Sequence, residues 1–579
     1  GEQARGAEKL HTLTSNKRSS EPAHESRIAR RDHKPRPNAA AKESMEELNA
    51  VGVYEDDEAV EPDDGQLKFK FSWRKLWAFT GPGWLMSLAY LDPGNLEADL
   101  QQGAYTRYSL LWVLLWATAL GLLLQEMAAR LGVVSGKALA EMGREVYPRR
   151  TSYMLYVMME LAIVGSDIQE VLGSAIGLNI LFGVPLWLGC LVTGLDTFTF
   201  LAVHHLGVRK LEALVTTLVF TMAVCFFINW GEAETNGADL LYGLVVPTMK
   251  PYMLTQAVGT IGAVVMPHNL YLHSGLVKSR TVDRKSPSRV HEAIRYNLIE
   301  SALALAVSFF INVAVVATFA DFFYSDTCAP KSMACVPAGA VDDDDFDRTC
   351  SSGFASGTAG VCAEIGLAVA APALRHAMGG FGRVMWGVGL LAAGQASTMT
   401  ATFAGQMVMQ GFLDLNLAPW VRVAVTRAAA LGPAVVVALS TAHNAPLQNR
   451  INEWLNILQS LQLPFAMVPL LYITSRSDIM GRFKNGGRMS LFAYAVAVLI
   501  LVINVALVVQ FVLDKDTPIP HGPGAYAVAL GYGVLYFWFI SWCVPDLFRR
   551  GPARDATTAA DDGYQALSST DGAATGGLA

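Results

Sequence analysis

Two stretches of the sequence place polar or sulfur-containing residues beside prolines inside long apolar runs. The first is LDPGNLEADL, residues 91–100, with Asp92 and Asn95 on either side of a Pro-Gly pair. The second is AVVMPHNLYLHS, residues 263–274, with Met266 directly before a proline. At bilayer depth a backbone can leave the helix only where it is buried in protein or lines a water-filled cavity. Each stretch therefore predicts a helix break inside a bundle, with freed carbonyl groups that can bind a cation.

The carboxylate of Asp92 is the most informative group in these stretches. An ionisable side chain at membrane depth is costly and generally faces a pathway or a partner. The alternative is that Asp92 only caps the half-helix that begins after it. A Ser or Asn would cap that helix without a buried charge, so a ligand role is favoured over capping alone.

The ligand types around the two breaks favour a transition-metal ion. Asp92 offers a carboxylate, Asn95 an amide oxygen, the turn near Ala263 a backbone carbonyl and Met266 a thioether. Oxygen ligands alone would suit Mg²⁺ or Ca²⁺, whereas the sulfur favours first-row transition metals. The alternative for Met266 is packing, which is the usual role of methionine in a membrane helix.

Three further carboxylates fall on one helix face in the apolar segment 152–182. Glu160, Asp167 and Glu170 lie within about 80° of one another at about 100° per residue. Carboxylates aligned inside a bundle predict a proton relay. The alternative is structural ion pairing, for which Arg427 is the obvious partner.

The second stretch also contains His268 and His273. A neutral imidazole can ligate a metal, and histidine also titrates near neutral pH. His268 follows Met266 by two residues, so in a helix it points away from the methionine. We therefore assign His268, and by its position His273, to proton coupling or gating rather than to the metal site.

Membrane-spanning helices must position these residues. The 579-residue chain is 52% hydrophobic and 16% charged, with a mean hydropathy of +0.32, which is typical of a protein embedded in the lipid bilayer. Its net charge of -6 argues against a nucleic-acid partner. Apolar runs of about 20 residues predict an all-α protein with twelve spans, near residues 76–104, 109–134, 152–182, 184–203, 211–230, 253–277, 298–323, 381–409, 421–440, 455–474, 491–513 and 525–544.

Charge predicts the orientation of the chain. Basic residues gather before the first span and after the second and sixth, so both termini are expected in the cytosol. Residues 1–65 and 546–579 are polar and predict disordered tails around a transporter domain at 66–545. No apolar segment with a cleavage site opens the chain, so no signal peptide is expected. Tyr564 to Leu567 has the form that sorting adaptors bind, although chance is the favoured explanation of so short a pattern.

Four of the seven cysteines fall in the long loop assigned to the outside. Two disulfides are expected there, with a pairing that the sequence leaves open, and four free thiols are the alternative in a reducing compartment. These cysteines are Cys328, Cys335, Cys350 and Cys362.

The two stretches share the pattern Pro-x-Asn-Leu, beginning at Pro93 and Pro267. They lie five predicted spans apart. Two five-span repeats of inverted topology, each with a broken first helix, would produce this pattern. We expect repeats at about 76–230 and 253–474, two extra helices at about 491–544, and a substrate site between the two breaks.

These stretches resemble the signature breaks of the Nramp family of proton-coupled divalent metal transporters. Further agreement comes from GSDIQEVLGS (165–174), GLLAAGQASTMTATFAGQMVMQG (389–411) and LNILQSLQLPF (455–465), and the likeness covers roughly residues 70–545. The twelfth span and the Cys-containing loop resemble the eukaryotic branch of the family. The resemblance implies a LeuT-like fold.

The resemblance also implies roles for individual residues. It implies that Asp92, Asn95, Met266 and the Ala263 carbonyl bind the metal, and that a polar residue of the tenth span joins them. Asn456 is favoured for that residue over Gln459, and Gln395 is a weaker candidate. The alternative role for these amides is a hydrogen bond between helices without any contact to the metal. It supports a relay through Asp167 most strongly, with Glu160, Glu170 and Arg427 along the route.

The predicted function is import of Mn²⁺, Fe²⁺ or Cd²⁺ with protons, with no cofactor apart from the transported ions. A channel would need a continuous polar filter. A sodium-coupled carrier of organic solutes would present a helix N-terminus to a substrate carboxylate, which Asp92 would repel. A metalloenzyme would need a His-rich zinc motif, and none occurs, so no enzyme is expected. The sequence leaves open Mn²⁺ against Fe²⁺, and a plasma membrane against an endosomal, lysosomal or vacuolar one.

Overall fold

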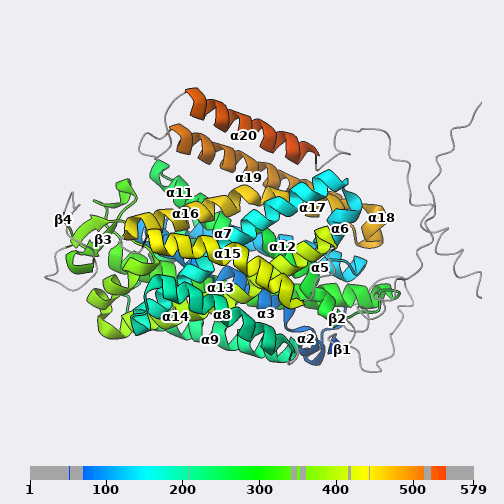
Figure 1. Cartoon of the computed structure of the whole chain (residues 1–579), viewed down its shortest axis with the longest axis horizontal. Coiled ribbons are helices and arrows are strands. Elements are labelled where there is room, and N and C mark those ends of the chain that lie inside the picture. Colours follow the sequence, from blue (N-terminus) through cyan, green and yellow to red (C-terminus); the bar gives the residue numbers. More distant parts are fainter. Residues whose placement is uncertain are drawn as a thin grey trace, which may run out of the picture. The chain divides into compact units, whose positions relative to one another are not determined.

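The computed structural model describes residues 51–52, 69–205, 208–340, 349–352, 360–414, 419–441, 444–513 and 523–542 (Figure 1). The motif from Tyr564 to Leu567 and the predicted C-terminal tail lie outside these residues, as does the predicted N-terminal tail apart from β1 (Val51–Gly52). β1 pairs in parallel with β2 (Arg280–Thr281).

The described chain is predominantly helical. Its helices are α2 (Trp73–Phe79), α3 (Pro82–Ser87), α4 (Pro93–Thr106), α5 (Leu111–Ser135), α6 (Leu139–Val146), α7 (Arg149–Phe182), α8 (Leu186–His205), α9 (Val208–Gly231), α10 (Gly237–Val245), α11 (Leu254–Val264), α12 (Pro267–Leu276), α13 (Pro287–Phe323), α14 (Leu367–Leu413), α15 (Pro419–Ser440), α16 (Ala445–Gln462), α17 (Pro464–Ser475), α18 (Ser477–Met480), α19 (Gly487–Leu513) and α20 (Pro523–Trp542).

Six helical stretches among the described residues are long and apolar enough to cross a membrane. The stretches are Leu111–Ser135, Arg149–Phe182, Glu212–Gly231, Pro287–Phe323, Pro446–Ser475 and Gly487–Ala506. Two shorter apolar helices, Leu186–Leu195 and Arg427–Ser440, accompany them. Several crossings by apolar helices make the chain a multi-pass integral membrane protein.

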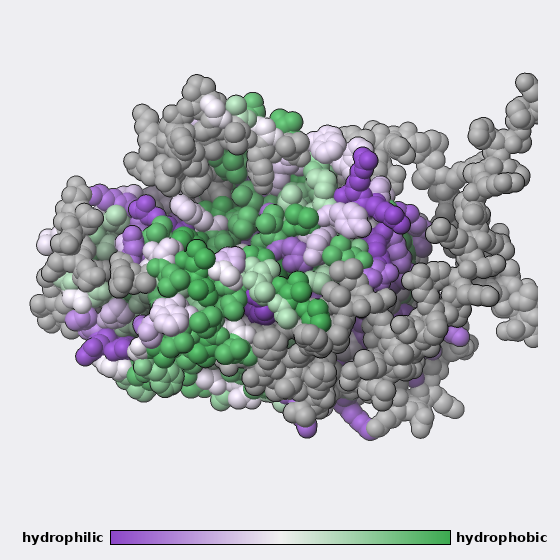
Figure 2. Space-filling model, viewed as in Figure 1, coloured by the Kyte–Doolittle hydropathy of each residue, from purple (hydrophilic) through white to green (hydrophobic). Residues whose placement is uncertain are grey.

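Burial in this fold is reversed relative to a soluble protein. Large apolar side chains such as Leu195, Phe220 and Val436 are more than 60% exposed. Figure 2 shows hydrophobic residues gathered on the surface over α8 and α15. Acids and amides lie inside instead, among them Asp92 and Asp167. A lipid-facing surface explains the exposed apolar patch, and the buried polar residues mark the interior pathway.

Polar turns extend three helices beyond the predicted spans. α13 begins at Pro287 rather than at residue 298, because Ser286 accepts a hydrogen bond from Arg289 N and Pro287 occupies the first turn. α16 begins at Ala445 rather than at 455, with the Asn444 side chain as its cap. α14 begins at Leu367 rather than at 381, and Gly379, at φ 75°, divides it into two helices. A hydropathy pattern detects only the apolar part of such helices.

The helices end at both proline stretches. A 3-10 turn at Leu88–Tyr90 follows α3, and Asp92 is extended (φ −72°, ψ 167°) before Pro93 begins α4. α11 ends at Val264, Met266 is extended (φ −70°, ψ 130°), and Pro267 begins α12. A proline is favourable at the first helical position because its missing N–H has no helical partner there. α4 packs against α7, α11, α13 and α16, so the two interruptions lie within the bundle.

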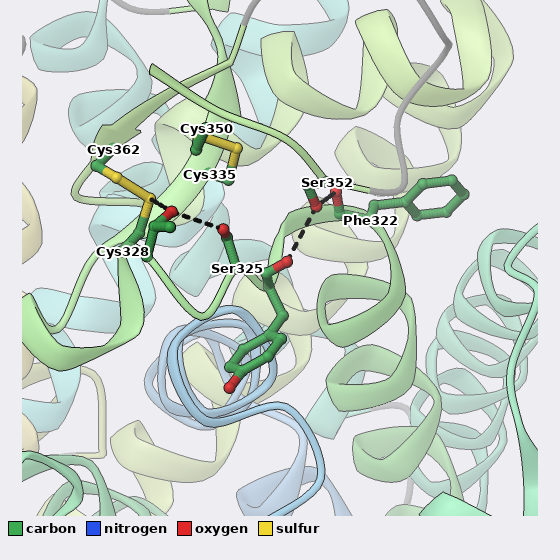
Figure 3. The surroundings of a disulfide bond; sticks show 9 residues. Phe322, Ser325, Cys328, Cys335, Cys350, Ser352 and Cys362 are labelled. Carbon is green, nitrogen blue, oxygen red and sulfur yellow. Dashed lines mark hydrogen bonds between the residues drawn. A yellow bond between two sulfur atoms is a disulfide. The ribbon is translucent and has the colours of Figure 1, made fainter. Parts of the chain in front are cut away.

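A small disulfide-linked sheet lies between α13 and α14. Strands β3 (Ala334–Pro337), β5 (Gly360–Ala363) and β4 (Thr349–Cys350) pair in that order, antiparallel. Disulfides join Cys328 to Cys362 and Cys335 to Cys350 (Figure 3), which is the pairing that the sequence leaves open.

The segment after β5 is bonded to α4. Glu97 Oε2 accepts a hydrogen bond from Leu367 N at 2.8 Å. The Tyr105 hydroxyl lies 3.1 Å from Ile365 N and 3.3 Å from Ile365 O. Glu364 pairs with Arg450 of α16 at 3.0 Å. We call residues 364–367 the strap, because they connect α4 with α16.

Candidate metal site

The Asp92 carboxylate both caps α4 and keeps one oxygen free. It is fully buried. Its Oδ1 accepts hydrogen bonds from Asn95 N at 2.8 Å and Asn95 Nδ2 at 2.7 Å. Its Oδ2 is buried with no hydrogen-bond partner among the described residues. Capping is therefore real but uses one oxygen only, and an unpaired buried carboxylate oxygen is costly unless a cation binds it.

Asn95 joins the first helix break to the second. Its Nδ2 donates to Ala263 O at 3.0 Å, in addition to Asp92 Oδ1. Its Oδ1 is buried and has no partner in the described part of the chain. The amide nitrogen thus lies between two acceptors, a carboxylate and a carbonyl, that come from different helix breaks. A cation in the place of this amide nitrogen would likewise be bound by the two oxygen atoms.

Met266 faces α7 from the second break. Ser166 Oγ lies 3.8 Å from Met266 Sδ and 2.9 Å from Glu170 Oε1. The single hydroxyl hydrogen of Ser166 can serve only one of these acceptors at a time. Glu170 Oε2 is buried without a partner among the described residues. Met266 therefore touches a polar, acidic neighbourhood rather than a purely apolar core.

Asn456 on α16 contacts the first break directly. Its Nδ2 donates to Gly94 O at 3.1 Å, and its Oδ1 accepts from Gln169 Nε2 at 2.9 Å. A Cβ atom on Gly94 would lie 2.9 Å from Gln169 Oε1 and 3.1 Å from Asn456 Oδ1, so only glycine leaves room for this contact. The same close packing recurs at Gly173, where a Cβ would lie 2.3 Å from a Pro93 carbon.

The other two amide candidates lie apart from this contact. Gln459 donates from Nε2 to Ala162 O of α7 at 2.7 Å. Gln395 on α14 is half-buried, and the described hydrogen bonds connect it to neither break. Among the three amides predicted for the site, Asn456 alone bonds to a helix break in the described structure.

The three acids of α7 differ in whether a basic side chain is bonded to them. Asp167 forms a buried ion pair with Arg427, which also donates to Thr398 O and Thr402 Oγ1. Glu160, nearer the start of α7, is hydrogen-bonded to Tyr156. The alternative of structural ion pairing is thus present for Asp167, which also lies within hydrogen-bonding reach of Glu170. Glu170 and Glu160 are bonded in addition to the hydroxyl groups of Ser166 and Tyr156.

His268 and His273 are both buried on α12, at 2% and 0% exposure. His268 Nδ1 and both ring nitrogens of His273 lack hydrogen-bond partners among the described residues. The two histidines are therefore available to accept a proton or a new hydrogen bond when the surroundings change.

Several buried polar residues of the site escape the sequence prediction. Gln169 lies inside the quoted motif 165–174, and its contact with Asn456 gives it a direct place beside the break. Asp99 is 1% exposed, and neither of its carboxylate oxygens has a partner among the described residues. Glu300 accepts from Gly81 N and Gly83 N and so holds the start of α3. Helical spacing could have identified Asp99, because it lies seven residues, or two turns, after Asp92.

Comparisons with known proteins identify the family of the chain. The family model described as natural resistance-associated macrophage protein-like, Nramp, matches residues 83–510. The chain belongs to the Nramp family. Metal transporter Nramp4 of Arabidopsis thaliana is 44% identical over 506 residues, covering 86% of the chain and 92% of that protein. Metal transporter nramp1 homolog of Dictyostelium discoideum is 46% identical over 473 residues, covering 81% of each.

A solved structure supports the same fold for this Nramp protein. The Eremococcus coleocola manganese transporter in complex with an aromatic bis-isothiourea substituted compound matches with a TM-score of 0.67 and 29% identity. The match covers 85% of this chain and all of that one. The family and the LeuT-like transporter fold predicted from the helix-break motifs are confirmed, and the protein is a transporter rather than an enzyme.

Proposed function

We propose that this Nramp protein imports divalent transition-metal ions, Mn²⁺ or Fe²⁺ and also Cd²⁺, into the cytosol together with protons, by alternating access. The observation that carries the proposal is the unpaired Oδ2 of Asp92, buried at a helix break beside the Ala263 carbonyl. A buried carboxylate in this position is stabilised by a cation or a proton, and no Lys or Arg among the described residues is bonded to it. The manganese named for the structural relative favours Mn²⁺ as one substrate.

The ligands of the transported ion would come from both breaks. We assign Asp92, Asn95, the Ala263 carbonyl and Met266 to the ion, with Asn456 approaching from α16 in part of the cycle. Asn95 Nδ2 now occupies the space between Asp92 Oδ1 and Ala263 O. A rotation of the Asn95 amide would withdraw this donor and turn its unpartnered Oδ1 toward the ion. Binding would then exchange an N–H donor for a metal between the same acceptors.

Selectivity would follow from the thioether of Met266. Mg²⁺ and Ca²⁺ gain little from sulfur and must release tightly held water to contact it. Mn²⁺, Fe²⁺ and Cd²⁺ accept a mixed oxygen and sulfur shell more readily.

Protons would travel beside the metal rather than through its ligands. We assign Glu160, Asp167, Glu170 and Arg427, with His268 and His273, to the coupling route. The Ser166 hydroxyl, placed between Met266 and Glu170, is the shortest described connection between the metal ligands and the acids of α7. A divalent ion in the site would add positive charge near Glu170, which favours the ionised carboxylate and so the release of its proton.

The proposal includes the architecture around the site. We propose twelve spans with both termini in the cytosol, and two inverted repeats that each contribute one of the described helix interruptions. Rocking of one repeat against the other would then expose the site to each side in turn. The physiological membrane would be the plasma membrane or an endosomal, lysosomal or vacuolar one.

Uptake into liposomes tests the proposal. Purified protein is reconstituted, and uptake of Mn²⁺, Fe²⁺, Cd²⁺, Mg²⁺ and Ca²⁺ is measured while the internal pH is recorded. We expect uptake of the first three ions with internal acidification, and neither signal with Asp92→Ala. Metal flux without any proton movement would indicate a channel. Acidification driven by an organic solute instead of a metal would indicate a carrier of another class.

A further inference from the structure

A pocket adjoins the metal site between α4, α11 and α16. Seven residues line it: Ala98, Gln101, Thr255, Gln256, Gly259, Glu453 and Asn456. The enclosed space is about 10 Å³, enough for roughly one water molecule, and it is partly open to solvent. We call it the approach pocket.

The approach pocket continues the metal site along the same three helices. It shares Asn456 with that site, and Glu453 lies three residues earlier on α16, on the same helix face. On α4 the lining begins at Ala98, three residues after Asn95. On α11 it includes Gly259, four residues before Ala263. An ion leaving the pocket past Asn456 would therefore meet Gly94 and the break at Asp92 next.

The lining is chemically suited to a hydrated cation. Glu453 contributes a half-buried carboxylate, and Gln256 Nε2 donates to Glu453 Oε1 at 3.3 Å. Gln256 is 6% exposed, and its Oε1 has no partner among the described residues. All polar groups of the lining side chains are carboxylate, amide or hydroxyl, with no sulfur, imidazole or basic group. Such a set favours a hard or water-covered ion without selecting among metals.

The charge around the pocket is acidic. Glu97 lies behind Gln101, whose Nε2 donates to Glu97 Oε1 at 2.9 Å. Glu97, Glu364 and Glu453 are close enough to repel one another electrostatically. The cation described nearby is Arg450, which forms an ion pair with Glu364. Arg450 also attracts Glu453, so in this part of the described structure one basic side chain faces three carboxylates. The excess negative charge draws cations to the pocket.

We propose that the approach pocket is a second cation site, where a divalent ion that has released part of its hydration shell is held by the Glu453 carboxylate and the unpartnered Oε1 of Gln256 before it reaches Asp92. The inference rests on the proposed transport of metal ions through the Asp92 site. The two sites would have different roles. The approach pocket concentrates divalent cations of any kind, and the sulfur-containing inner site selects among them.

Direct binding of Mn²⁺ separates the two sites. Electron paramagnetic resonance of free Mn²⁺ is used to titrate purified protein that carries Asp92→Ala. We expect a remaining weak site in that variant, which Ca²⁺ displaces, and its loss when Glu453→Gln is added. Equal Mn²⁺ binding by Asp92→Ala and by the double variant would overturn the proposal. This result is independent of the proposed function, whose own test is the loss of uptake in Asp92→Ala.

Transport kinetics give a second measurement if the double variant does not fold. Glu453→Gln should raise the KM for Mn²⁺ about tenfold at low ionic strength, leave kcat unchanged, and lose most of this effect in high salt. Glu453→Asp keeps the charge and should restore the low KM. A KM that is unchanged in Glu453→Gln, or a lower kcat at equal KM, would overturn the proposal, because a merely structural role would not depend on salt.

Discussion

Asp92 and Asp167 are both buried aspartates inside the helix bundle, yet their surroundings differ in kind. Asp92 lies at a break, bonded only to Asn95 and with Oδ2 unpaired. Asp167 lies within the regular helix α7, in an ion pair with Arg427. The counterion of Asp167 is a permanent part of the chain, whereas no basic side chain among the described residues is bonded to Asp92. Buried charge alone therefore does not identify a transport site. What distinguishes Asp92 is that its unpaired oxygen lies at a helix break.

The local backbone explains this difference. At the break, Ala263 O lies in the turn that ends α11 and can bond to Asn95 across the gap. α7 remains helical from Arg149 to Phe182, so its carbonyls around Asp167 are used within the helix. A cation at Asp92 could also be bound by a backbone carbonyl oxygen beside the carboxylate. A cation at Asp167 could be bound only by side chains, because the carbonyls there are used within the helix. The comparison predicts opposite responses to loss of each carboxylate.

The largest expected effect is on transport, from Asp92→Ala. Mn²⁺ uptake should fall to background, because the charged ligand is lost, while the melting temperature in detergent stays equal or rises, because an unpaired buried charge is removed. Asp239→Ala, at an exposed ion pair with Arg107, is the matched control and should transport normally. Uptake close to the parental rate in Asp92→Ala would show that Asp92 is not a ligand of the transported metal.

Breaking the ion pair of α7 should instead reduce stability. Arg427→Gln leaves Asp167 buried and unpaired, which should cost about 3–5 kcal/mol of unfolding free energy in detergent micelles. Adding Asp167→Asn removes the isolated charge and should recover part of that loss. A single Arg427 variant as stable as the parent would show that Asp167 does not depend on this counterion.

Asp167→Asn by itself tests the proton route. The amide keeps the shape of the side chain but cannot accept a proton, so metal-stimulated acidification of liposomes should fall more than Mn²⁺ binding does. Both quantities are measured on the same preparation, with Asp239→Asn, at an exposed ion pair with Arg107, as a control for loss of one acid outside α7. Intact acidification with weaker binding would place Asp167 outside the relay.

Met266→Ala should alter selectivity by about tenfold, which corresponds to about 1.4 kcal/mol. Water can fill the vacated space and give Ca²⁺ or Mg²⁺ the oxygen ligand that they prefer. We expect the variant to carry Mn²⁺ with weaker apparent affinity and to admit Ca²⁺. The measurement is Mn²⁺ uptake with Ca²⁺ in excess, parent against variant. An identical competition profile would mean that Met266 serves packing only.

The smallest expected effect concerns Asn456. Replacing it with Ala removes the bonds to Gly94 O and Gln169 Nε2. A net hydrogen bond contributes about 1 kcal/mol, so the apparent affinity for Mn²⁺ should weaken about threefold with transport retained. Gln459→Ala is the matched control, since Gln459 bonds to α7 away from the break. Equal effects of the two variants would assign both residues to helix packing.

The sequence predicts the parts of this site that depend on local chemistry. Prolines and glycines beside Asp92 and Met266 indicate the interruptions because few other residues act so strongly on the backbone. The cysteine pairing and the Asn456 contact with Gly94 depend on how distant segments meet, which no local pattern contains. The motif at the first break ends at Asn95 and does not identify Glu97 or Asp99, although helical spacing continues along α4. The polar first turns of α13 and α16 were missed because hydropathy detects only their apolar parts.

The strap also constrains the order in which the chain can assemble during synthesis. Glu97 belongs to α4, but the amide that bonds to it, Leu367 N, follows 270 residues later. At about 5–20 residues per second, a ribosome needs roughly ten to fifty seconds to make that interval. During this time Glu97 Oε2 lacks the donor that Leu367 N supplies, and within α4 only Oε1 can be bonded, by Gln101. The bond between α4 and the strap therefore forms only after the second half of the chain has begun to emerge.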